Sequence, residues 1–379
     1  MWETSAEWRE ALTGSRTMTA LAAITRDGDD LTTGDGLVPT SWRIVDTLSG
    51  AQVQSKLDMV VTDPDGSMLT EDPLSPLQVY GQRVSLNVTV ASGDWSESLP
   101  MGIWRLNTST PSGGPWRYYA GTWLRPAQTV TVSAEDLLVL VAEYGFLGLS
   151  TPPSGATSEA EIRRLLDGAI GYDQGDLVSK DVARAPWSGS RLDAVLSVIA
   201  DMGAVAVVGR DGVLTGIPST GTGHVVPITA ATEPGWGLGL INWSPLASRE
   251  GVVNGIAATG QALDGATLYG RALEESGPTA WSADGFGRVT QSEHNALWTT
   301  QAKTNAGAAS TLVAHQRARA QTLTVTTLPD PSVDVLDTAA ITLPESGRTI
   351  SGLITERQIG SSGPMTLTVS VPFGEAIYG

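Results

Sequence analysis

The 379-residue sequence contains no cysteine, only three histidines and only three phenylalanines. Without cysteine the chain can form neither a disulfide nor a zinc site with thiolate ligands. The absence of cysteine does not indicate whether the protein works in an oxidising or a reducing compartment. Charged residues make up 17% and hydrophobic residues 41% of the chain, which is typical of a packed globular protein rather than a disordered one. Since the length exceeds what one hydrophobic core usually holds, we expect two to four compact units.

Positive charge is also scarce. Lys and Arg number 23 against 40 Asp and Glu, so the formal net charge is −17. This balance argues against stable binding to a nucleic-acid backbone and against docking on an anionic membrane, because both need clustered basic residues. The opening residues MWETSAEWREALTGS are neither basic nor apolar, and no apolar run is long enough to cross a bilayer. We therefore expect a soluble chain without a signal peptide, made in a cytoplasm and not anchored to a membrane.

The first third of the chain is predicted to be β-rich. A short helix precedes it, with Thr4 and Glu7 at capping-box spacing and Gly14 as its end. Short runs with β character follow, and the clearest, 83–91, alternates apolar and polar residues as a half-buried strand does. The other predicted strands are 17–25, 42–48, 56–62, 99–108 and 127–133. This pattern predicts a first domain of mainly β structure over residues 1–133.

Helical periodicity marks the middle of the chain. We expect a helix between Ser133 and Gly145, a second opened by a capping box of Ser158 and Glu161, and a third after Ser190. A hairpin of strands 204–208 and 213–217 then follows. Residues 134–220 are thus predicted to form a small α+β insert.

The last part of the chain, 221–379, is again predicted to be mainly β. A Gly-, Thr- and Pro-rich passage over 218–239 precedes the next strand signals, and an Ala-rich helix is expected at about 299–320. The apolar stripe of that helix is predicted as Ala302, Ala306, Ala309, Leu312 and Val313. The expected strands are 251–259, 265–273, 322–327, 338–343, 349–357 and 365–371. The predicted fold class is therefore α+β, mainly β.

Metal-binding and nucleotide-binding patterns are weak. The histidines His224, His294 and His315 lie far apart in sequence, without a second ligand at metal-binding spacing. The segment Asp27–Asp30 lacks the remaining ligands of a calcium loop and is better explained as a β-turn. Residues 235–239 (GWGLG) lack the spacing of a dinucleotide loop and are interpreted as a flexible connector. No metal or cofactor residue is predicted.

Candidate acid–base pairs are Asp334 with Asp337 and Glu274 with Glu275, which could serve glycoside hydrolysis if the fold spaced two carboxylates correctly. Such pairs are common in any acidic protein, and no nucleophile elbow or phosphate loop accompanies them. We therefore predict no catalytic residue and no enzymatic activity.

Tryptophan is unusually abundant, with 12 residues against three phenylalanines. Tryptophan can replace phenylalanine in a core, anchor a protein interface or stack on sugars, and the sequence leaves these three uses open. Those near predicted turns are Trp95, Trp104, Trp116, Trp123, Trp187, Trp236, Trp243, Trp281 and Trp298.

Four spaced segments resemble a known family. They are 57–66 (LDMVVTDPDG), 72–86 (DPLSPLQVYGQRVSL), 99–106 (LPMGIWRL) and 247–260 (ASREGVVNGIAATG). Together with the segment 329–337 and the strands of 349–371, they resemble the minor tail proteins of actinobacteriophages, which are similar to phage tail-tip and baseplate hub proteins. The resemblance covers most of 37–106 and 245–371, and its weight lies in the order and spacing of the segments.

This resemblance implies a structural role without catalytic, cofactor or metal residues. It implies two β-barrel domains, 1–133 and 221–379, flanking the insert 134–220. Three chains would form a ring at the tail tip of the virion that joins the sixfold tail tube to the threefold tip and lets DNA pass without binding it stably. The implied partners are further copies in a homotrimer, a distal tail protein, a tape measure protein and tip or fibre proteins, assembled in the host cytoplasm. The alternatives are a receptor- or glycan-binding tail protein that uses exposed tryptophan and, less favoured, a cell-wall hydrolase of the tail.

Overall fold

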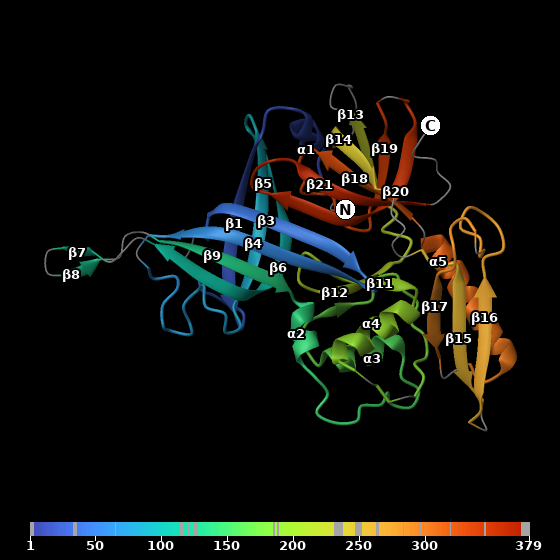
Figure 1. The fold of residues 1–379 in the computed structure, drawn as a ribbon. Helices are drawn as coiled ribbons and strands as arrows, with labels where there is room; N and C mark the ends of the chain where they lie inside the picture. The colour runs from blue at the N-terminus through green and yellow to red at the C-terminus, as the bar shows by residue number, and fades with distance from the viewer. Residues whose placement is uncertain are drawn as a thin grey trace. The chain divides into compact units, whose positions relative to one another are not determined.

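The computed structural model describes residues 4–32, 36–64, 66–113, 117–119, 122–124, 128–184, 186–187, 189–230, 238–246, 252–262, 265–282, 284–295, 298–318, 320–344 and 346–372. The chain divides into two compact units, and Figure 1 shows their elements. Unit 1 comprises residues 1–243 and 324–369, and unit 2 comprises residues 244–323 and 370–379. The predicted fold class, mainly β with a smaller helical part, is confirmed. The finer division at residues 133 and 220 stays a prediction.

Six strands near the N-terminus form the first barrel. Their hydrogen-bonded order is β3 (Pro39–Ser49), β4 (Gln52–Asp63), β9 (Gln128–Asp136), β6 (Trp95–Gly113), β5 (Arg83–Ser92) and β1 (Thr17–Arg26). Alternate side chains point inward, as in β5, where Val84, Leu86, Val88 and Val90 are all fully buried. Backbone bonds between Ala22 and Leu37, at 2.7 and 2.8 Å, bring the end strand β1 to the segment just before β3. The predicted alternation of 83–91 therefore builds a barrel wall.

Three short strands extend this barrel. The strand β2 (Asp29–Asp30) pairs with the end of β1. The strands β7 (Arg117–Tyr119) and β8 (Thr122–Leu124) form a separate two-stranded sheet between β6 and β9.

A second barrel is formed by strands from the last part of the chain. Its order is β19 (Thr338–Thr342), β13 (Val225–Ala230), β14 (Leu238–Leu246), β18 (Ala320–Thr327), β21 (Met365–Pro372) and β20 (Thr349–Gly360), and pairing of β19 with β20 closes it. The strand β20 also pairs with β3, from Glu356 opposite Thr47 to Gly360 opposite Arg43. One continuous hydrogen-bonded sheet therefore runs through both barrels, as the red and blue strands show in Figure 1.

No strand was predicted within the Gly-, Thr- and Pro-rich passage 218–239, but it contains β13 and the start of β14. Val226 and Ile228 point into the second barrel from β13, and Leu238 begins β14. The short alternation is interrupted by Pro227, and proline is usually a sign against a strand. Residues 235–237 of the GWGLG segment lie outside the described residues.

The middle of the chain folds onto the first barrel as an α+β layer. Helices α2 (Leu138–Glu143), α3 (Ser158–Leu166) and α4 (Arg191–Asp201) pack with the hairpin of β11 (Ala204–Val208) and β12 (Leu214–Pro218) around one apolar core. The short strand β10 (Tyr172–Asp173) pairs with β12. Ala206 of β11 pairs with Gln52 of β4, so the insert continues the main sheet. The predicted helix after Ser190 and the predicted hairpin are confirmed.

The first residue of each helix was predicted less accurately than the existence of the helix. α1 (Ala6–Thr13) is capped by Ser5 rather than Thr4, because the Ser5 hydroxyl accepts the N–H of Trp8. α3 is capped by Thr157 rather than Ser158, and Glu161 is buried against Arg164 and Trp187. Ser133 does not cap a helix, since β9 continues to Asp136.

Unit 2 is a three-stranded sheet with one helix. The order is β16 (Thr267–Leu273), β15 (Gly255–Gln261) and β17 (Thr290–His294), and α5 (Gln301–Ala318) packs on β15 and β16. A Cβ atom on Gly260 would lie 2.2 Å from the backbone oxygen of Trp298, and one on Gly270 would lie 2.8 Å from that of Thr304. Both glycines therefore permit a close approach that no side chain allows.

The contact face of α5 differs from the predicted stripe. Of the predicted residues only Leu312 is buried, whereas Ala302, Ala306 and Ala309 are exposed and Val313 is 42% exposed. The buried face consists of Thr304, Gly307, Ala308 and Leu312. The predicted face was wrong because alanine occurs on all sides of this helix, so the apolar residues do not single out one face.

Candidate functional site

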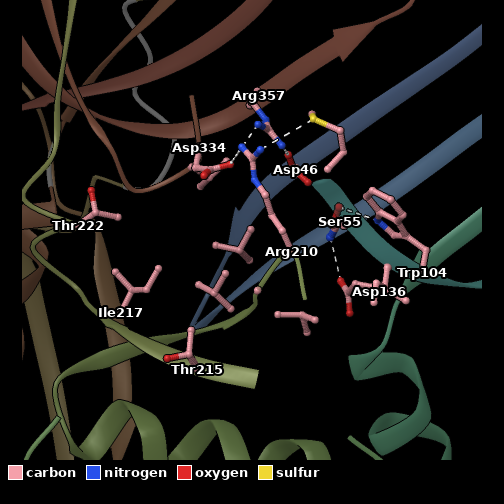
Figure 2. Close-up of a pocket in the computed structure, with 18 residues that line it drawn as sticks. Asp46, Ser55, Trp104, Asp136, Arg210, Thr215, Ile217, Thr222, Asp334 and Arg357 are labelled. Atoms are coloured by element: carbon pink, nitrogen blue, oxygen red, sulfur yellow. Dashed lines mark hydrogen bonds and ion pairs between the residues drawn. The ribbon is translucent and has the colours of Figure 1, made fainter. Parts of the chain in front are cut away.

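A cavity of about 170 Å³ lies within unit 1, where three parts of the chain converge (Figure 2). The first barrel contributes side chains from β3, β4 and β6, and the insert contributes the β11–β12 hairpin. The third wall comes from the segment before β19 and from β20. The walls combine apolar side chains with two groups of buried and half-buried polar residues.

The first polar group is an alternating chain of two arginines and two aspartates. Arg357 of β20 donates to Asp46 of β3 at 2.8 Å and to Asp334 at 3.1 Å. Arg210, from the β11–β12 turn, donates to Asp334 at 2.6 Å. Figure 2 shows these four side chains meeting at one wall of the cavity. We call Asp46, Arg210, Asp334 and Arg357 the ionic cluster.

Backbone carbonyls complete the ionic cluster. Arg210 donates to the carbonyl oxygens of Pro331 at 2.8 Å and Pro100 at 3.0 Å, and Arg357 donates to that of Val333. Each guanidinium group thus bonds to two or more chain segments. The cluster fixes the first barrel, the insert and the second barrel against one another with a formal charge of zero.

Electrostatics keep the cluster ionised. Burial alone would raise the pKa of Asp334, but the guanidinium groups of Arg210 and Arg357 outweigh it and hold that pKa below its ordinary value. Burial alone would lower the pKa of Arg357, but Asp46 and Asp334 raise it above its ordinary value. Asp334 is therefore a permanent anion at neutral pH and is unsuited to donate or abstract a proton.

The second polar group, Ser55, Trp104 and Asp136, lies to the right of and below the ionic cluster in Figure 2. Asp136, at the end of β9, accepts the N–H groups of Ser55 and Leu138, each at 2.8 Å. The indole N–H of Trp104 donates to the hydroxyl of Ser55 at 2.9 Å. Burial raises the pKa of Asp136, although its two N–H donors oppose the shift.

The two aspartates predict opposite responses to pH. Because the folded-state pKa of Asp334 is lowered, its stabilisation is complete above the unfolded value of about 3.9 and is lost as pH falls through the folded pKa. The folded-state pKa of Asp136 is raised, so its contribution is complete below about 3.9 and is lost as pH rises through the folded pKa. On acidification the stability advantage of wild type over Asp334→Asn should shrink, and that over Asp136→Asn should grow. Urea denaturation of the three proteins, from neutral pH to below about 3.9, measures both stability differences. Differences that do not change with pH would contradict the assignment.

The carboxylates of the two candidate acid–base pairs make other contacts. Asp337 accepts the backbone N–H of Asp334 at 2.9 Å and the hydroxyl of Thr222 at 2.7 Å, so both aspartates hold the loop before β19. Glu274 is buried and accepts the hydroxyl of Thr279 at 3.0 Å, whereas Glu275 is exposed. Neither pair has the environment of a paired acid and base.

The suggested metal ligands are also dispersed. His224 lies 3.7 Å from Asp337 in unit 1, and His294 lies 3.1 Å from the hydroxyl of Thr259 in unit 2. His315 is half-buried on α5. Asp27 and Gly28 form the turn between β1 and β2. Across the residues that the structure describes, no three His, Asp or Glu residues are grouped as metal ligands.

The tryptophans whose side chains are described are all buried or half-buried. Trp8, Trp42 and Trp104 are at most 5% exposed, and Trp8 packs edge-on against Trp95 at 6.2 Å. The half-buried ones are Trp95, Trp187, Trp243, Trp281 and Trp298. The side chains of Trp116, Trp123 and Trp236 lie outside the described residues. Core packing therefore accounts for most of the described tryptophans.

Sequence reasoning missed Asp46, Arg210 and Arg357. A signal was present for Asp46, because it continues the inward-facing alternation of Trp42 and Ile44 along β3. A charge at such a position indicates a buried partner. In β20 the inward-facing phase changes between Ile354 and Arg357, so alternation alone would not have pointed Arg357 inward. Arg210 lies in a turn, where an arginine carries no comparable signal.

Comparison with known proteins extends the fold assignment. No protein-family model and no curated protein sequence matches the chain. Solved structures of tail proteins do match. The tail protein from Neisseria meningitidis MC58 has a TM-score of 0.58 and 12% sequence identity, over 93% of this chain and 96% of that one. The 43 kDa tail protein of prophage MuSo2 from Shewanella oneidensis has a TM-score of 0.57 and 13% identity, over 93% and 97%.

A third neighbour is the prophage tail protein gp18 from Listeria monocytogenes EGD-e. It has a TM-score of 0.50 and 9% identity, over 92% of this chain and 94% of that one. The chain therefore has the fold of phage tail proteins along nearly its whole length. Among the described helices, none combines the length and apolar character needed to cross a bilayer.

Proposed function

We propose that this chain is a structural subunit of a phage tail, and specifically the central hub of the tail tip or baseplate. The β3–β20 ladder is the observation that carries this proposal. It joins two six-stranded barrels of one chain edge to edge. Two barrels per chain would let three chains supply six barrels, which is the number needed to join a sixfold tube to a threefold tip.

The ionic cluster supports the same role. A hub must keep its two barrels in a fixed relation, and Arg357 and Arg210 bond to both barrels from within the protein. The pairs that resembled catalytic groups hold loops instead, which favours a structural protein over a hydrolase. DNA would pass through the ring without stable binding, since the net charge of the chain is −17. Its partners would be further copies and the distal, tape measure and tip or fibre proteins of the tail, within the virion.

The oligomeric state tests this proposal. We expect native mass spectrometry and sedimentation to give three chains per particle, for the chain alone or co-expressed with the tail proteins encoded beside it. Electron cryo-microscopy of the particle should show a ring of six barrels around an open channel. A monomer under both conditions, or a ring of six chains, would contradict the hub assignment.

A further inference from the structure

The cavity of unit 1 has an unbalanced charge. Its lining contains three carboxylates and two guanidinium groups, which belong to Asp46, Asp136, Asp334, Arg210 and Arg357. Both guanidinium groups are paired within the ionic cluster, with Asp46 and Asp334. The lining therefore carries a formal charge of −1, and this charge resides on Asp136. Because a buried charge without a counter-ion is costly, Asp136 needs either a cation or a proton.

The carboxylate of Asp136 is held in place and lies in a negative field. Its side chain belongs to a residue that is 8% exposed, and its two oxygens accept the backbone N–H groups of Ser55 and Leu138. A carboxylate has about four lone-pair sites, so these two bonds leave capacity for a further donor. The charged neighbours that shift its pKa, Glu135 and Asp46, are both anionic. Among the described residues, no basic side chain forms an ion pair with Asp136.

A second acceptor lies beside this carboxylate. The hydroxyl of Ser55 accepts the indole N–H of Trp104 at 2.9 Å and keeps a second lone pair. The indole ring lies against Gly102, where a Cβ atom would come within 2.7 Å of it. The glycine thus lets the ring pack on the backbone and orient Ser55 next to Asp136, as Figure 2 shows. An ammonium group has three N–H donors and can bond to both acceptors.

The remaining walls of the cavity are largely apolar and leave room for more than one water. The volume of about 170 Å³ is far above the roughly 10–15 Å³ that a single water needs. Met101, Val207, Val208 and Ile217 line it, and the exposed Thr222 brings the lining to the protein surface. Such walls suit an alkyl group better than a hydrated metal ion, which prefers several oxygen ligands.

We propose that this cavity binds a small alkylammonium ion. Its ammonium group pairs with Asp136 and bonds to Ser55, and its alkyl group lies against the apolar wall. Binding balances the charge of the lining and fills space where the two barrels and the insert converge. Asp136 ends β9 and directly precedes the residues that begin α2, so the bound cation stabilises the junction of barrel and insert. Every group involved belongs to one chain, and the proposal therefore does not depend on the ring.

A pair of ligands of similar size and different charge tests the proposal. The full chain is titrated with n-butylammonium chloride at about pH 8, which favours the carboxylate form of Asp136, with potassium chloride holding the ionic strength constant. Ligand-detected NMR should show saturable binding of one amine per chain, and Tm should rise with amine concentration. The neutral n-butanol should bind at least about tenfold more weakly, because it lacks the charge-assisted bond.

Two variants locate the binding. Asp136→Asn should weaken amine binding by about tenfold or more and remove the preference for amine over alcohol. Glu135→Gln is the matched control, since it removes the same charge one residue earlier. The side chain of Glu135 is 32% exposed and pairs with Lys56, so this variant should bind the amine like wild type.

A crystal structure of the wild-type chain with n-butylammonium provides a readout that needs no variant to fold. The ammonium group should lie within hydrogen-bonding distance of Asp136, and an amine bound elsewhere overturns the proposal. Equal binding of amine and alcohol, or unchanged amine binding by Asp136→Asn, contradicts it as well. If the amine does not bind the folded wild-type chain, Asp136 is neutralised by a proton instead and the proposal is wrong. The hub assignment is unaffected by these results, because the oligomeric state tests it separately.

Discussion

Replacing Arg357 with methionine is expected to lower the free energy of unfolding of unit 1 by about 3–5 kcal/mol. The guanidinium group is 3% exposed and bonds to Asp46 and Asp334, so its removal leaves the carboxylate of Asp46, which is 9% exposed, without this cation. The cost is dominated by that uncompensated charge rather than by the lost attraction. Urea denaturation followed by tryptophan fluorescence measures it, since Trp42 and Trp104 are buried in the same unit.

Two further variants separate charge from packing. Lys56→Met removes a cation whose side chain is 60% exposed and lies 3.5 Å from Glu135, so the loss should stay below about 1 kcal/mol. Adding Asp46→Asn to Arg357→Met should recover part of the stability, because the buried charge is then removed as well. A loss below 1 kcal/mol for Arg357→Met would show that the ionic cluster does not join the barrels.

Replacing Gly260 with valine is expected to destabilise unit 2 by about 3 kcal/mol or more. A Cβ atom there would lie 2.2 Å from the backbone oxygen of Trp298 and 2.9 Å from the hydroxyl oxygen of Thr304. The first of these atoms belongs to the backbone just before α5, so the helix would have to move away from β15. Hydrogen exchange of amides in α5 and β15 measures the loss locally.

The neighbouring residue provides the matched control. Gln261 is the next residue of β15, is exposed and points to the other face, so Gln261→Val should change stability by less than about 0.5 kcal/mol. Equal protection of α5 in wild type and Gly260→Val would contradict the close packing of helix on sheet.

Strand positions were the most predictable part of this fold. The alternation of 83–91 and of 365–371 corresponds to β5 and β21, because a strand with one buried face repeats every two residues. The existence of α3 and α4 was also predictable, because apolar residues with helical spacing mark the buried face of each helix. Helix starts were displaced, since neighbouring Thr and Ser at 4–5 and at 157–158 can each cap a helix.

The site was less predictable than the fold. Asp334 was considered only as a candidate for an acid–base pair, but its partners Arg210 and Arg357 are 124 and 23 residues away, one in the β11–β12 turn and the other in β20. The strands in 218–239 were not predicted, because β13 has only 6 residues and contains Pro227, and because β14 only begins within this passage. Both errors have one cause. The role of Asp334 and the strand conformation within 218–239 depend on partners that are far away in sequence.

The ladder between β3 and β20 also sets an order for folding on the ribosome. The two strands lie about 300 residues apart, so β3 is synthesised long before its partner exists. Until β20 emerges, the segment Arg43–Thr47 remains an unpaired edge that is free to pair with the same segment of another nascent chain. Neighbouring ribosomes on one messenger RNA therefore hold together the nascent chains most prone to misassociation, and wide spacing between ribosomes favours correct closure over aggregation.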